Sequence, residues 1–360
     1  MNILVLAGGY SPERNVSLSS GAMIAGALRG KGHNVALIDS YLGVSAAEAD
    51  MEQLFQKEIC EDWKAISTAV PDLQALKKAH PECKNRLVGP NVLRLAREAD
   101  VVFLALHGGS GEDGRIQAAL DLMGVHYTGS DYLGSGIAMN KHLTKILAKE
   151  AGVAVPDWEI RDIMDEEAIE AAMCEVKLPI VVKVPGGGSS IGVYIAKTPA
   201  ELRSALECSL GQRMIFEQYI EGREIQMGFL DGKALPSIEI VVNKEFYNYE
   251  NKYQKGLAIE KTPADILPSQ EKEMGEMLLL VANALSLRVY SRADFIIDKA
   301  GKIWFIEINT LPGMTPTSLL PQEAEAVGVT FGDLCEKIIS EALKESVGTE
   351  DKILIEKKAE

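Results

Sequence analysis

Short apolar runs alternate with amphipathic stretches through the first third of the chain. Three of these runs predict buried strands, because each is continuously apolar and only a few residues long; they are 2–7, 34–39 and 101–106. Strands that alternate with helices predict a parallel sheet, which binds ligands beyond the carboxyl ends of its strands. Glycine pairs follow the first and last of these strands, at Gly8-Gly9 and Gly108-Gly109, so both exits are candidate sites.

The pattern becomes mixed in the rest of the chain. It predicts, in order, a helical region at 135–170 broken at Pro156, a strand at 178–184, strands through 213–241 with a hairpin at Asp231-Gly232, a loop at 246–256 and a helix at 269–286. Residues 44–98 are polar and mostly helical in pattern, and they contain no motif that indicates a function.

Size and charge exclude one broad class of function. The chain has 360 residues and a mass of 39.1 kDa, which predicts two or three subdomains rather than one core. Its formal net charge of −15 argues against a nucleic-acid groove, because phosphate backbones require surplus Lys and Arg. An anionic small molecule such as ATP still fits, provided that lysines cluster locally.

Cysteine spacing and hydropathy indicate the cellular compartment. The five cysteines are widely spaced, form no CxxC pair and lie in no His-bearing motif, which favours reduced thiols over disulfides, a zinc site or a catalytic cysteine. The N-terminal apolar run is too short for a signal peptide, and no apolar stretch approaches the ~20 residues of a membrane span. We therefore expect a cytoplasmic protein with no membrane or nucleic-acid partner.

The segment 292–309 contains two strand-like runs around Ala300-Gly301. A two-residue turn there would place Asp294 opposite Glu307, with their Cβ atoms ~5 Å apart. Because strands alternate their faces with a period of two, Arg292 and Asn309 would share that face. The opposite face would be apolar and would carry Phe295, Ile297, Trp304, Ile306 and Ile308.

Two facing carboxylates repel each other unless a cation lies between them. Carboxylate and amide oxygens in an open site suit Mg²⁺ bound together with phosphate, so Asp294, Glu307 and Asn309 are candidate ligands. The alternative is a solvated polar face on which Arg292 and Asp294 form an ordinary surface pair. The apolar opposite face and the Asn-Thr-Leu-Pro-Gly turn that follows favour the metal site, on the assumption that the register is not shifted by one residue.

Residues 183–192, with the sequence KVPGGGSSIG, are compatible with two functions. Gly/Ser-rich segments form flexible linkers, and Gly-rich segments next to a lysine fold over nucleotide phosphates. Lys183 at the end of the preceding strand favours the phosphate loop. Lys141, Glu217 and Glu224 give no such indication singly, since each alone looks like an ordinary solvated charge.

In their order along the chain, these segments resemble the ATP-grasp ligases, and within them the D-alanine–D-alanine ligase family. The resemblance extends from residue 8 to residue 321 with near-family spacing, and it does not cover 44–98. The motifs that carry it are GGYSPERNVSLSSG, LALHGGSGEDGRIQAALDLMGVHYTGSD, MNKHLTK, LPIVVKVPGGGSSIG, FEQYIEGREI, FYNYENKY, RADF and EINTLPGMTPTSLLP.

The resemblance implies an α/β (α+β) chain in which an N-terminal Rossmann-like parallel-sheet domain precedes a two-part ATP-grasp fold. It implies four segments: an N-terminal substrate-side domain at 1–129, a central ATP-grasp subdomain with the Gly-Ser phosphate loop at 130–217, a C-terminal ATP-grasp subdomain with the metal site at 218–345, and a charged tail at 346–360. A homodimer is the assembly that the resemblance implies.

The resemblance also implies a nucleotide and metal site. Lys141 and Lys183 would contact the α- and β-phosphates, Glu217 and Glu224 would hold adenine and ribose, Ser190 would lie near the phosphates, and Lys252 would reach the γ-phosphate. Asp294, Glu307 and Asn309 match Mg²⁺ ligands, with Mn²⁺ as a substitute, in agreement with the hairpin argument.

The amino-acid substrates are implied to bind to a second group of residues. Glu13 would bind the ammonium of the first D-alanine and form a latch with Ser189 and Tyr253. Arg292 and the Gly313 N–H would stabilise the tetrahedral oxyanion, and Ser318 and the Leu319 N–H would bind the carboxylate of the second D-alanine. His107 would be in contact with the site or have a structural role.

The implied reaction uses ATP to turn the first D-alanine into an acyl phosphate, which the amine of the second D-alanine attacks, for peptidoglycan precursor synthesis. D-lactate-specific relatives lose the tyrosine matched by Tyr253, and D-serine-specific relatives often have Arg at the position of Leu319, so both alternatives are disfavoured. Another ATP-grasp amino-acid ligase is the next alternative. A catalytically silent ATP-binding or regulatory module would have lost a metal ligand or the oxyanion arginine, and neither is missing.

The chain departs from the family pattern at three positions. Asn140 stands where the family commonly has Asp, Asn15 stands where it has a second acid, and Pro185 follows Lys183 by two residues rather than directly. These departures concern loop geometry and remove no matched catalytic group.

Overall fold

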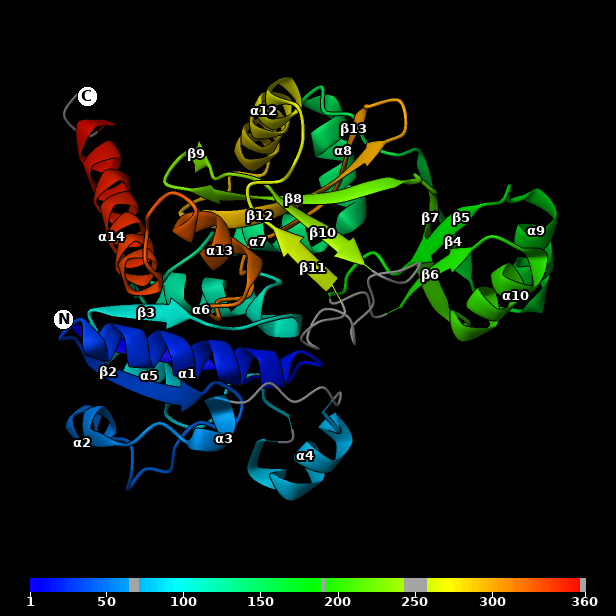
Figure 1. Cartoon of the computed structure of the whole chain (residues 1–360). Helices are drawn as coiled ribbons and strands as arrows, with labels where there is room; N and C mark the ends of the chain where they lie inside the picture. Colours follow the sequence, from blue (N-terminus) through cyan, green and yellow to red (C-terminus); the bar gives the residue numbers. More distant parts are fainter. Residues whose placement is uncertain (65–70, 84, 189–191, 243–257, 357–360) are drawn as a thin grey trace.

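The computed structural model describes residues 1–64, 71–83, 85–188, 192–242 and 258–356, and within them the strands form three sheets (Figure 1). The strands are β1 Asn2–Ala7, β2 Asn34–Asp39, β3 Val101–Leu104, β4 Trp158–Ile163, β5 Ile180–Lys183, β6 Val193–Ala196, β7 Gln212–Gln218, β8 Gly222–Leu230, β9 Lys233–Ala234, β10 Ile238–Val242, β11 Ala258–Lys261, β12 Tyr290–Asp298 and β13 Ile303–Asn309.

The helices cover the faces of these sheets. They are α1 Arg14–Gly30, α2 Met51–Gln56, α3 Glu61–Lys64, α4 Leu73–Ala79, η1 Pro81–Cys83, α5 Val92–Glu98, η2 Gly109–Gly111, α6 Arg115–Leu122, α7 Tyr132–Met139, α8 Lys141–Glu150, α9 Glu166–Glu175, α10 Pro199–Cys208, α12 Pro268–Ala284, α13 Leu319–Glu325 and α14 Phe331–Glu356. Among the helices of the described residues, none has the length and apolarity to cross a membrane.

The first sheet has the strand order β2-β1-β3 and is parallel throughout, as the alternating pattern predicts. Its strands are buried at nearly every position, as their apolar runs predict; α1 packs on β1 and β2, and α14 contacts both α1 and β3 (Figure 1). The third strand ends at Leu104, two residues before the predicted end at residue 106. The carboxyl ends of all three strands therefore meet at one edge of the sheet.

The second sheet has the order β4-β7-β5-β6 with antiparallel neighbours, and α9 and α10 pack next to it. The helical interpretation of 135–170 is wrong for 158–163, which form β4. Because β4 is an edge strand that pairs only with β7, it keeps polar side chains in solvent and lacks the apolar run of a buried strand.

The third sheet has the order β11-β10-β8-β12-β13, with β9 paired to β8. The predicted hairpin is present, with Asp231 at φ 53° and Gly232 at φ 71° between β8 and β9. Helices α7, α8 and α12 pack on this sheet, and α8 also contacts the second sheet through the Lys145–Glu217 ion pair and the His142–Trp158 hydrogen bond. The domain boundaries stay predictions, and the segment predicted as a charged tail is helical as far as Glu356.

The turn of the β12–β13 hairpin corrects the two-residue turn predicted from the sequence. Gly301 donates to the Asp298 carbonyl at 2.9 Å, and Asp298 donates to the Lys302 carbonyl at 3.0 Å. The turn therefore has three residues, and Gly301 adopts φ 85°, a left-handed conformation that suits glycine.

A bulge near Ile306 compensates for this longer turn. The register shifts between Asp294 and Phe295, so that Asp294 still pairs with Glu307 and Arg292 with Asn309, as predicted. The predicted apolar face is wrong on β13, where Trp304 and Ile306 are only half-buried. The core side chains of the hairpin are instead Phe295, Ile297, Ile303, Phe305 and Ile308.

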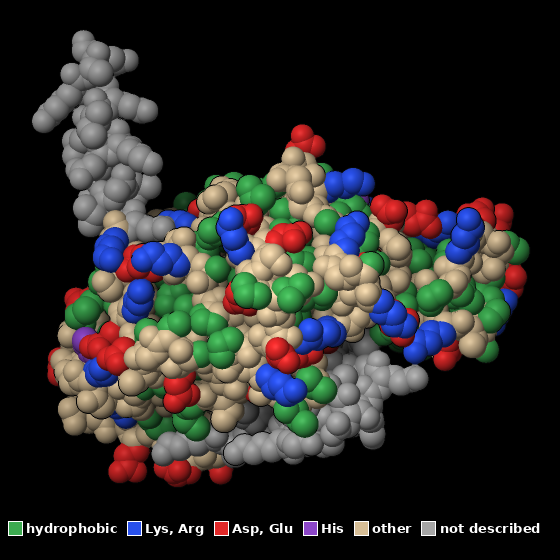
Figure 2. All heavy atoms as spheres, turned by 45° about the horizontal axis from the view of Figure 1, so that its top comes forward, with side chains coloured by type: hydrophobic (Ala, Val, Ile, Leu, Met, Phe, Trp, Pro, Cys, Tyr) green, Lys and Arg blue, Asp and Glu red, His purple; other side chains and the backbone are tan. Residues whose placement is uncertain are grey.

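Charges of both signs are mixed on one face of the molecule. Figure 2 shows Lys and Arg side chains interspersed with Asp and Glu side chains over the described part of one face. A groove for a nucleic-acid backbone needs a continuous basic stripe, and the coloured residues of this face do not form one.

Candidate functional site

A cleft lies between the second and third sheets, and its lining comes from β5, β6 and β7 on one side and from β8, β12 and β13 on the other. Apolar side chains such as Val181, Ile195 and Ile296 form part of its walls. Six of the residues predicted for the site line the same cleft: Lys141, Lys183, Glu217, Glu224, Asp294 and Glu307. The fold thus brings together charges that the sequence separates by more than a hundred positions.

Buried charges converge at the end of the cleft formed by the second sheet. Glu217 is 3% exposed, accepts a hydrogen bond of 2.7 Å from Lys183 Nζ, and forms an ion pair with the fully buried Lys145. Burial lowers the pKa of Lys145 to about 8, although the Glu217 charge opposes this shift. Burial alone would raise the pKa of Glu217, but the two lysines outweigh it and lower that pKa.

Sequence reasoning missed Lys145. Its spacing of four residues from Lys141 places both lysines on one face of α8, which was the available indication. The structure uses that spacing to direct one ammonium group to Glu307, at 3.3 Å, and the other to Glu217.

The depressed pKa of Lys145 leads to a stability prediction. Between pH 8 and 10.5 the unfolded chain binds a proton that the folded chain has lost, so this group makes stability rise with pH in that window. We expect Lys145→Met to remove a gain of roughly 2–3 kcal/mol in the free energy of unfolding between pH 8 and pH 10. Urea unfolding at both pH values measures this gain, with Lys149→Met on the exposed side of α8 as the control. An equal change in the free energy of unfolding between pH 8 and pH 10 in wild type and Lys145→Met would contradict the lowered pKa of Lys145.

The lead-in of the glycine-rich loop is hydrogen-bonded to the start of α8. The Lys141 N–H donates to the Pro185 carbonyl at 2.8 Å, and Lys141 Nζ donates to the Gly187 carbonyl at 2.5 Å. The Asn140 side chain accepts from the N–H groups of His142 and Leu143, which is the N-cap function an Asp would serve. Asn140 and Pro185, two of the departures from the family pattern, therefore both lie where the start of α8 is hydrogen-bonded to the glycine-rich loop.

Asp294 lines the cleft on the side of the third sheet, and Arg292 is paired with it. Arg292 Nε and Nη2 donate to the two oxygens of Asp294 at 3.0 and 3.4 Å, and Gln226 Nε2 donates to Asp294 Oδ2 at 3.3 Å. The side chains of the ion pair are 13% and 9% exposed, so the alternative of a solvated surface pair is wrong. Burial alone would lower the pKa of Arg292, and the charge of Asp294 raises it instead.

The predicted metal ligands share one face of the hairpin. Asp294 and Glu307 are register partners, and Asn309 lies two residues along β13 from Glu307. No three His, Cys, Asp or Glu side chains in the described part of the chain converge to hold a metal ion. The donor set is therefore two carboxylates and one amide, all oxygen ligands.

Glu13 lies where the first sheet meets the glycine-rich loop. A Cβ atom at either Gly108 or Gly188 would stand 2.5 Å from Glu13 Oε2, so a side chain at either position would displace the Glu13 carboxylate. A cavity between the two elements is lined by Glu13, Gly108, Gly187 and Gly188. The other latch members, Ser189 and Tyr253, lie outside the described residues, as do Ser190 and Lys252.

His107 connects the first sheet to the loop after β13. Its Nδ1 is 2.9 Å from the Leu311 carbonyl and its Nε2 is 2.9 Å from Ser20 Oγ. A carbonyl only accepts, so Nδ1 carries the proton and Nε2 accepts from the Ser20 hydroxyl. Burial lowers the pKa of His107, which keeps the ring neutral. Both ring nitrogens are thus occupied, which favours the structural role over direct substrate contact.

Glu112 is a second residue that sequence reasoning did not single out, although it lies in the HGGSGEDG motif. It accepts hydrogen bonds from Gly108 N at 2.7 Å and Leu311 N at 3.3 Å, and so joins the two loops that His107 also joins. Burial and then the nearby Glu13 charge raise the pKa of Glu112 to about 8.

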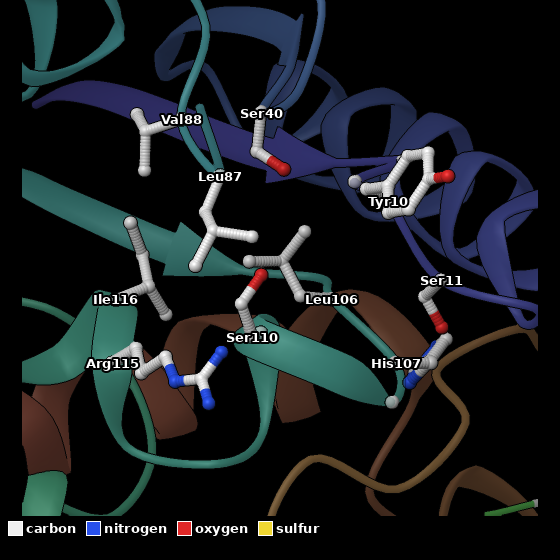
Figure 3. A pocket seen from close by; sticks show the side chains of 14 residues that line it. Tyr10, Ser11, Ser40, Leu87, Val88, Leu106, His107, Ser110, Arg115 and Ile116 are labelled. Carbon is white, nitrogen blue, oxygen red and sulfur yellow. The ribbon is translucent and has the colours of Figure 1, made fainter. Parts of the chain in front are cut away.

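The strand exits of the first sheet line a pocket of their own. Figure 3 shows Tyr10 after β1, Ser40 after β2 and Leu106 after β3 around it, with His107 and Ser11 next to one another at its edge. The glycine-rich exits predicted as candidate sites therefore do lie together, at the carboxyl ends of the strands.

The loop after β13 presents the remaining predicted residues. A Cβ atom at Gly313 would lie 2.9 Å from Ser318 Oγ, which accepts a hydrogen bond from Thr315 N at 3.1 Å. Leu319 is 8% exposed and packs with Ile238 and Ile240 of β10. The Gly313 backbone and the Ser318 hydroxyl are thus neighbours at the N-terminus of α13.

Known proteins share both the sequence and this architecture. Two family models match, D-ala D-ala ligase N-terminus over residues 2–130 and D-ala D-ala ligase C-terminus over residues 147–340. A D-alanine–D-alanine ligase of Pediococcus pentosaceus is 42% identical over 94% of this chain and 97% of its own length, and one of Aquifex aeolicus is 35% identical over 94% and 100%.

Solved structures agree with these relatives. A D-alanine–D-alanine ligase from Bacillus anthracis, complexed with ATP, superimposes with a TM-score of 0.70 at 28% identity, over 97% of this chain and 99% of that one. The VanG D-Ala:D-Ser ligase from Enterococcus faecalis gives 0.71 at 25% identity, over 94% and 98%. The two facing sheets around the cleft are the ATP-grasp fold. With family models over both halves and relatives of this identity over nearly its full length, the chain belongs to the D-alanine–D-alanine ligase family.

Proposed function

We propose that this chain ligates two D-alanines at the expense of ATP, giving D-alanyl-D-alanine, ADP and phosphate for peptidoglycan precursor synthesis. The observation that carries the proposal is the convergence of Lys141, Asp294 and Glu307 in one cleft between two sheets, with the buried Arg292 paired to Asp294. The cleft supplies cations for phosphates and a buried guanidinium for an oxyanion. Membership in the family supports the same reaction.

In the first step, a carboxylate oxygen of the first D-alanine attacks the γ-phosphorus of ATP, and ADP leaves. Lys141 and Lys183 neutralise the α- and β-phosphates, and Glu217 and Glu224 hold the adenine and ribose. The loop near Gly188 closes over the phosphates, with Ser190 close to them and Lys252 at the γ-phosphate. Catalysis of this step consists mainly of positioning and charge neutralisation.

In the second step, the amine of the second D-alanine attacks the acyl carbon, and phosphate leaves from the tetrahedral intermediate. Glu13 binds the ammonium of the first D-alanine and forms the latch with Ser189 and Tyr253. Arg292 and the Gly313 N–H stabilise the oxyanion, a contribution that grows as the charge develops. Ser318 and the Leu319 N–H bind the second carboxylate.

The hairpin face fits Mg²⁺. Asp294 and Glu307 are directly opposite one another, and each is already next to a cationic side chain, Arg292 and Lys141 respectively, as expected where two carboxylates need positive charge. Asn309 adds an amide oxygen, and such oxygen donors with phosphate suit Mg²⁺ or Mn²⁺. The bound ion would neutralise phosphate charge, while Asp294, Glu307 and Asn309 hold it.

D-Alanine is the second substrate that we favour over D-serine and D-lactate. The Leu319 side chain is packed into the apolar cluster with Ile238 and Ile240, so this position offers no polar group to a hydroxyl. Tyr253 argues against D-lactate through the family resemblance. A cytoplasmic location, where ATP is available, and a homodimeric assembly complete the proposal.

The test is phosphate release from ATP that depends on D-alanine, with the dipeptide identified by mass spectrometry. D-Alanine, D-serine and D-lactate are assayed side by side, which separates the proposed ligase from its relatives. A chain that binds ATP but releases no phosphate on addition of D-alanine is a regulatory module, and the proposal then fails. Greater activity with D-serine would overturn the choice of second substrate alone.

A further inference from the structure

Glu323 is a buried carboxyl group that the reaction described above does not use. It lies on α13, has no exposed surface, and no side chain among the described residues forms a hydrogen bond with either of its oxygens. Buried polar side chains are nearly always hydrogen-bonded, and the exceptions tend to have a functional reason. The surroundings of Glu323 are therefore informative.

Glu323 reaches the sheet through a gap in β8. A Cβ atom at Gly228 would overlap Glu323 Oε2 and Leu320 Cδ1, so α13 approaches the strand at the point where β8 has no side chain. The carboxyl group occupies the volume that a side chain at position 228 would fill. Any residue other than glycine there would displace it.

Arg292 is directly opposite this gap. In the antiparallel β8–β12 register, Gly228 pairs with Arg292 and Gln226 pairs with Asp294. Paired residues project on the same face with Cβ atoms ~5 Å apart, so the Glu323 carboxyl lies on the face from which the Arg292 side chain projects.

We propose that Glu323 is a positioning residue for Arg292: its carboxyl group, admitted by the missing side chain at Gly228, orients the guanidinium from the α13 side while Asp294 orients it from β12. This inference rests on the proposed role of Arg292 at the oxyanion. It also connects Ser318 and Leu319 to the arginine, because Ser318 caps α13, which begins at Leu319 and carries Glu323.

The carboxyl group acts in its neutral form. Burial raises the pKa of Glu323 well above its usual range, against the opposing charge of Arg292. No hydrogen bond joins Glu323 to the guanidinium in this structure, so the carboxyl acts through its dipole, and in its neutral form it does not cancel the positive charge that the oxyanion needs. Glutamine offers the same carbonyl oxygen in nearly the same volume, and leucine offers none.

Steady-state kinetics of Glu323→Leu and Glu323→Gln test the proposal. We expect Glu323→Leu to lower kcat at least tenfold while KM for ATP and for both D-alanines stays within twofold, and Glu323→Gln to recover most of the lost kcat. Glu325→Leu, exposed on the same helix, is the matched control and should leave kcat unchanged. A residue that merely seats α13 would instead raise KM for the second D-alanine, and that result, or equal rates in Glu323→Leu and wild type, would overturn the proposal.

A second measurement does not depend on activity. Gly228→Ala should displace Glu323 and lower Tm, and adding Glu323→Ala to it should restore part of that loss, whereas independent sites would add. Additive effects on Tm would contradict the contact. A wild-type enzyme without D-alanine-dependent phosphate release would defeat the proposed function, while a non-additive cycle would still establish the Gly228–Glu323 contact.

Discussion

Arg292→Ala is expected to lower kcat by about 10²–10³, the loss measured when a single oxyanion donor is removed elsewhere. The guanidinium is buried between Asp294 and the α13 side of the cleft, so water has little access to replace its charge. Because the interaction strengthens only as the oxyanion forms, KM for ATP should change little. Phosphate release at saturating ATP and D-alanine measures the effect.

The control separates this role from a general loss of charge or fold. Arg213→Ala removes an exposed arginine of β7 that pairs with Asp162, and it should leave kcat unchanged. Removing Arg292 also leaves Asp294 buried with less compensation, so circular dichroism must confirm folding, and Arg292→Lys provides a variant that keeps the charge. A folded Arg292→Ala enzyme at more than a tenth of the wild-type rate would reject the oxyanion assignment.

The sequence predicted the three strands of the first sheet, with the end of β3 placed two residues too far along the chain, because apolar runs followed by glycine have few alternative structures. It did not predict β4, because this edge strand keeps polar side chains in solvent and so lacks the continuous apolar run of a buried strand. The pairing of Asp294 with Glu307 was predicted correctly from a wrong turn, because a three-residue turn and a later bulge cancel in the register. Only the buried side chains of β13 expose the error, since the bulge moves Ile306 to the cleft.

Contacts made by tertiary packing had no counterpart in the local pattern. Lys145 looks like any helix-surface lysine until the second sheet covers it and places Glu217 against it. Glu323 looks like a solvent-exposed residue of a polar helix, and its burial depends on a glycine almost a hundred positions earlier. Such pairs join distant segments: the four-residue spacing of Lys141 and Lys145 indicates the helix face that they share, but not the partner that this face meets.

Glu307→Gln is expected to reduce turnover by about 10²–10³, the scale for an electrostatic group at a phosphoryl-transfer centre. Glu307 has two partners that need its negative charge: Lys141, at 3.3 Å, and the Mg²⁺ that we propose between it and Asp294. The amide keeps the shape and loses the charge, so the variant should fold and should require far more Mg²⁺ for the same rate. Glu159→Gln on exposed β4 is the control and should behave as wild type.

Thermal stabilisation by ATP, measured over a series of Mg²⁺ concentrations, provides a readout independent of turnover. If Mg²⁺ strengthens ATP binding equally in Glu307→Gln and wild type, Glu307 is not a ligand, and the hairpin argument fails with it.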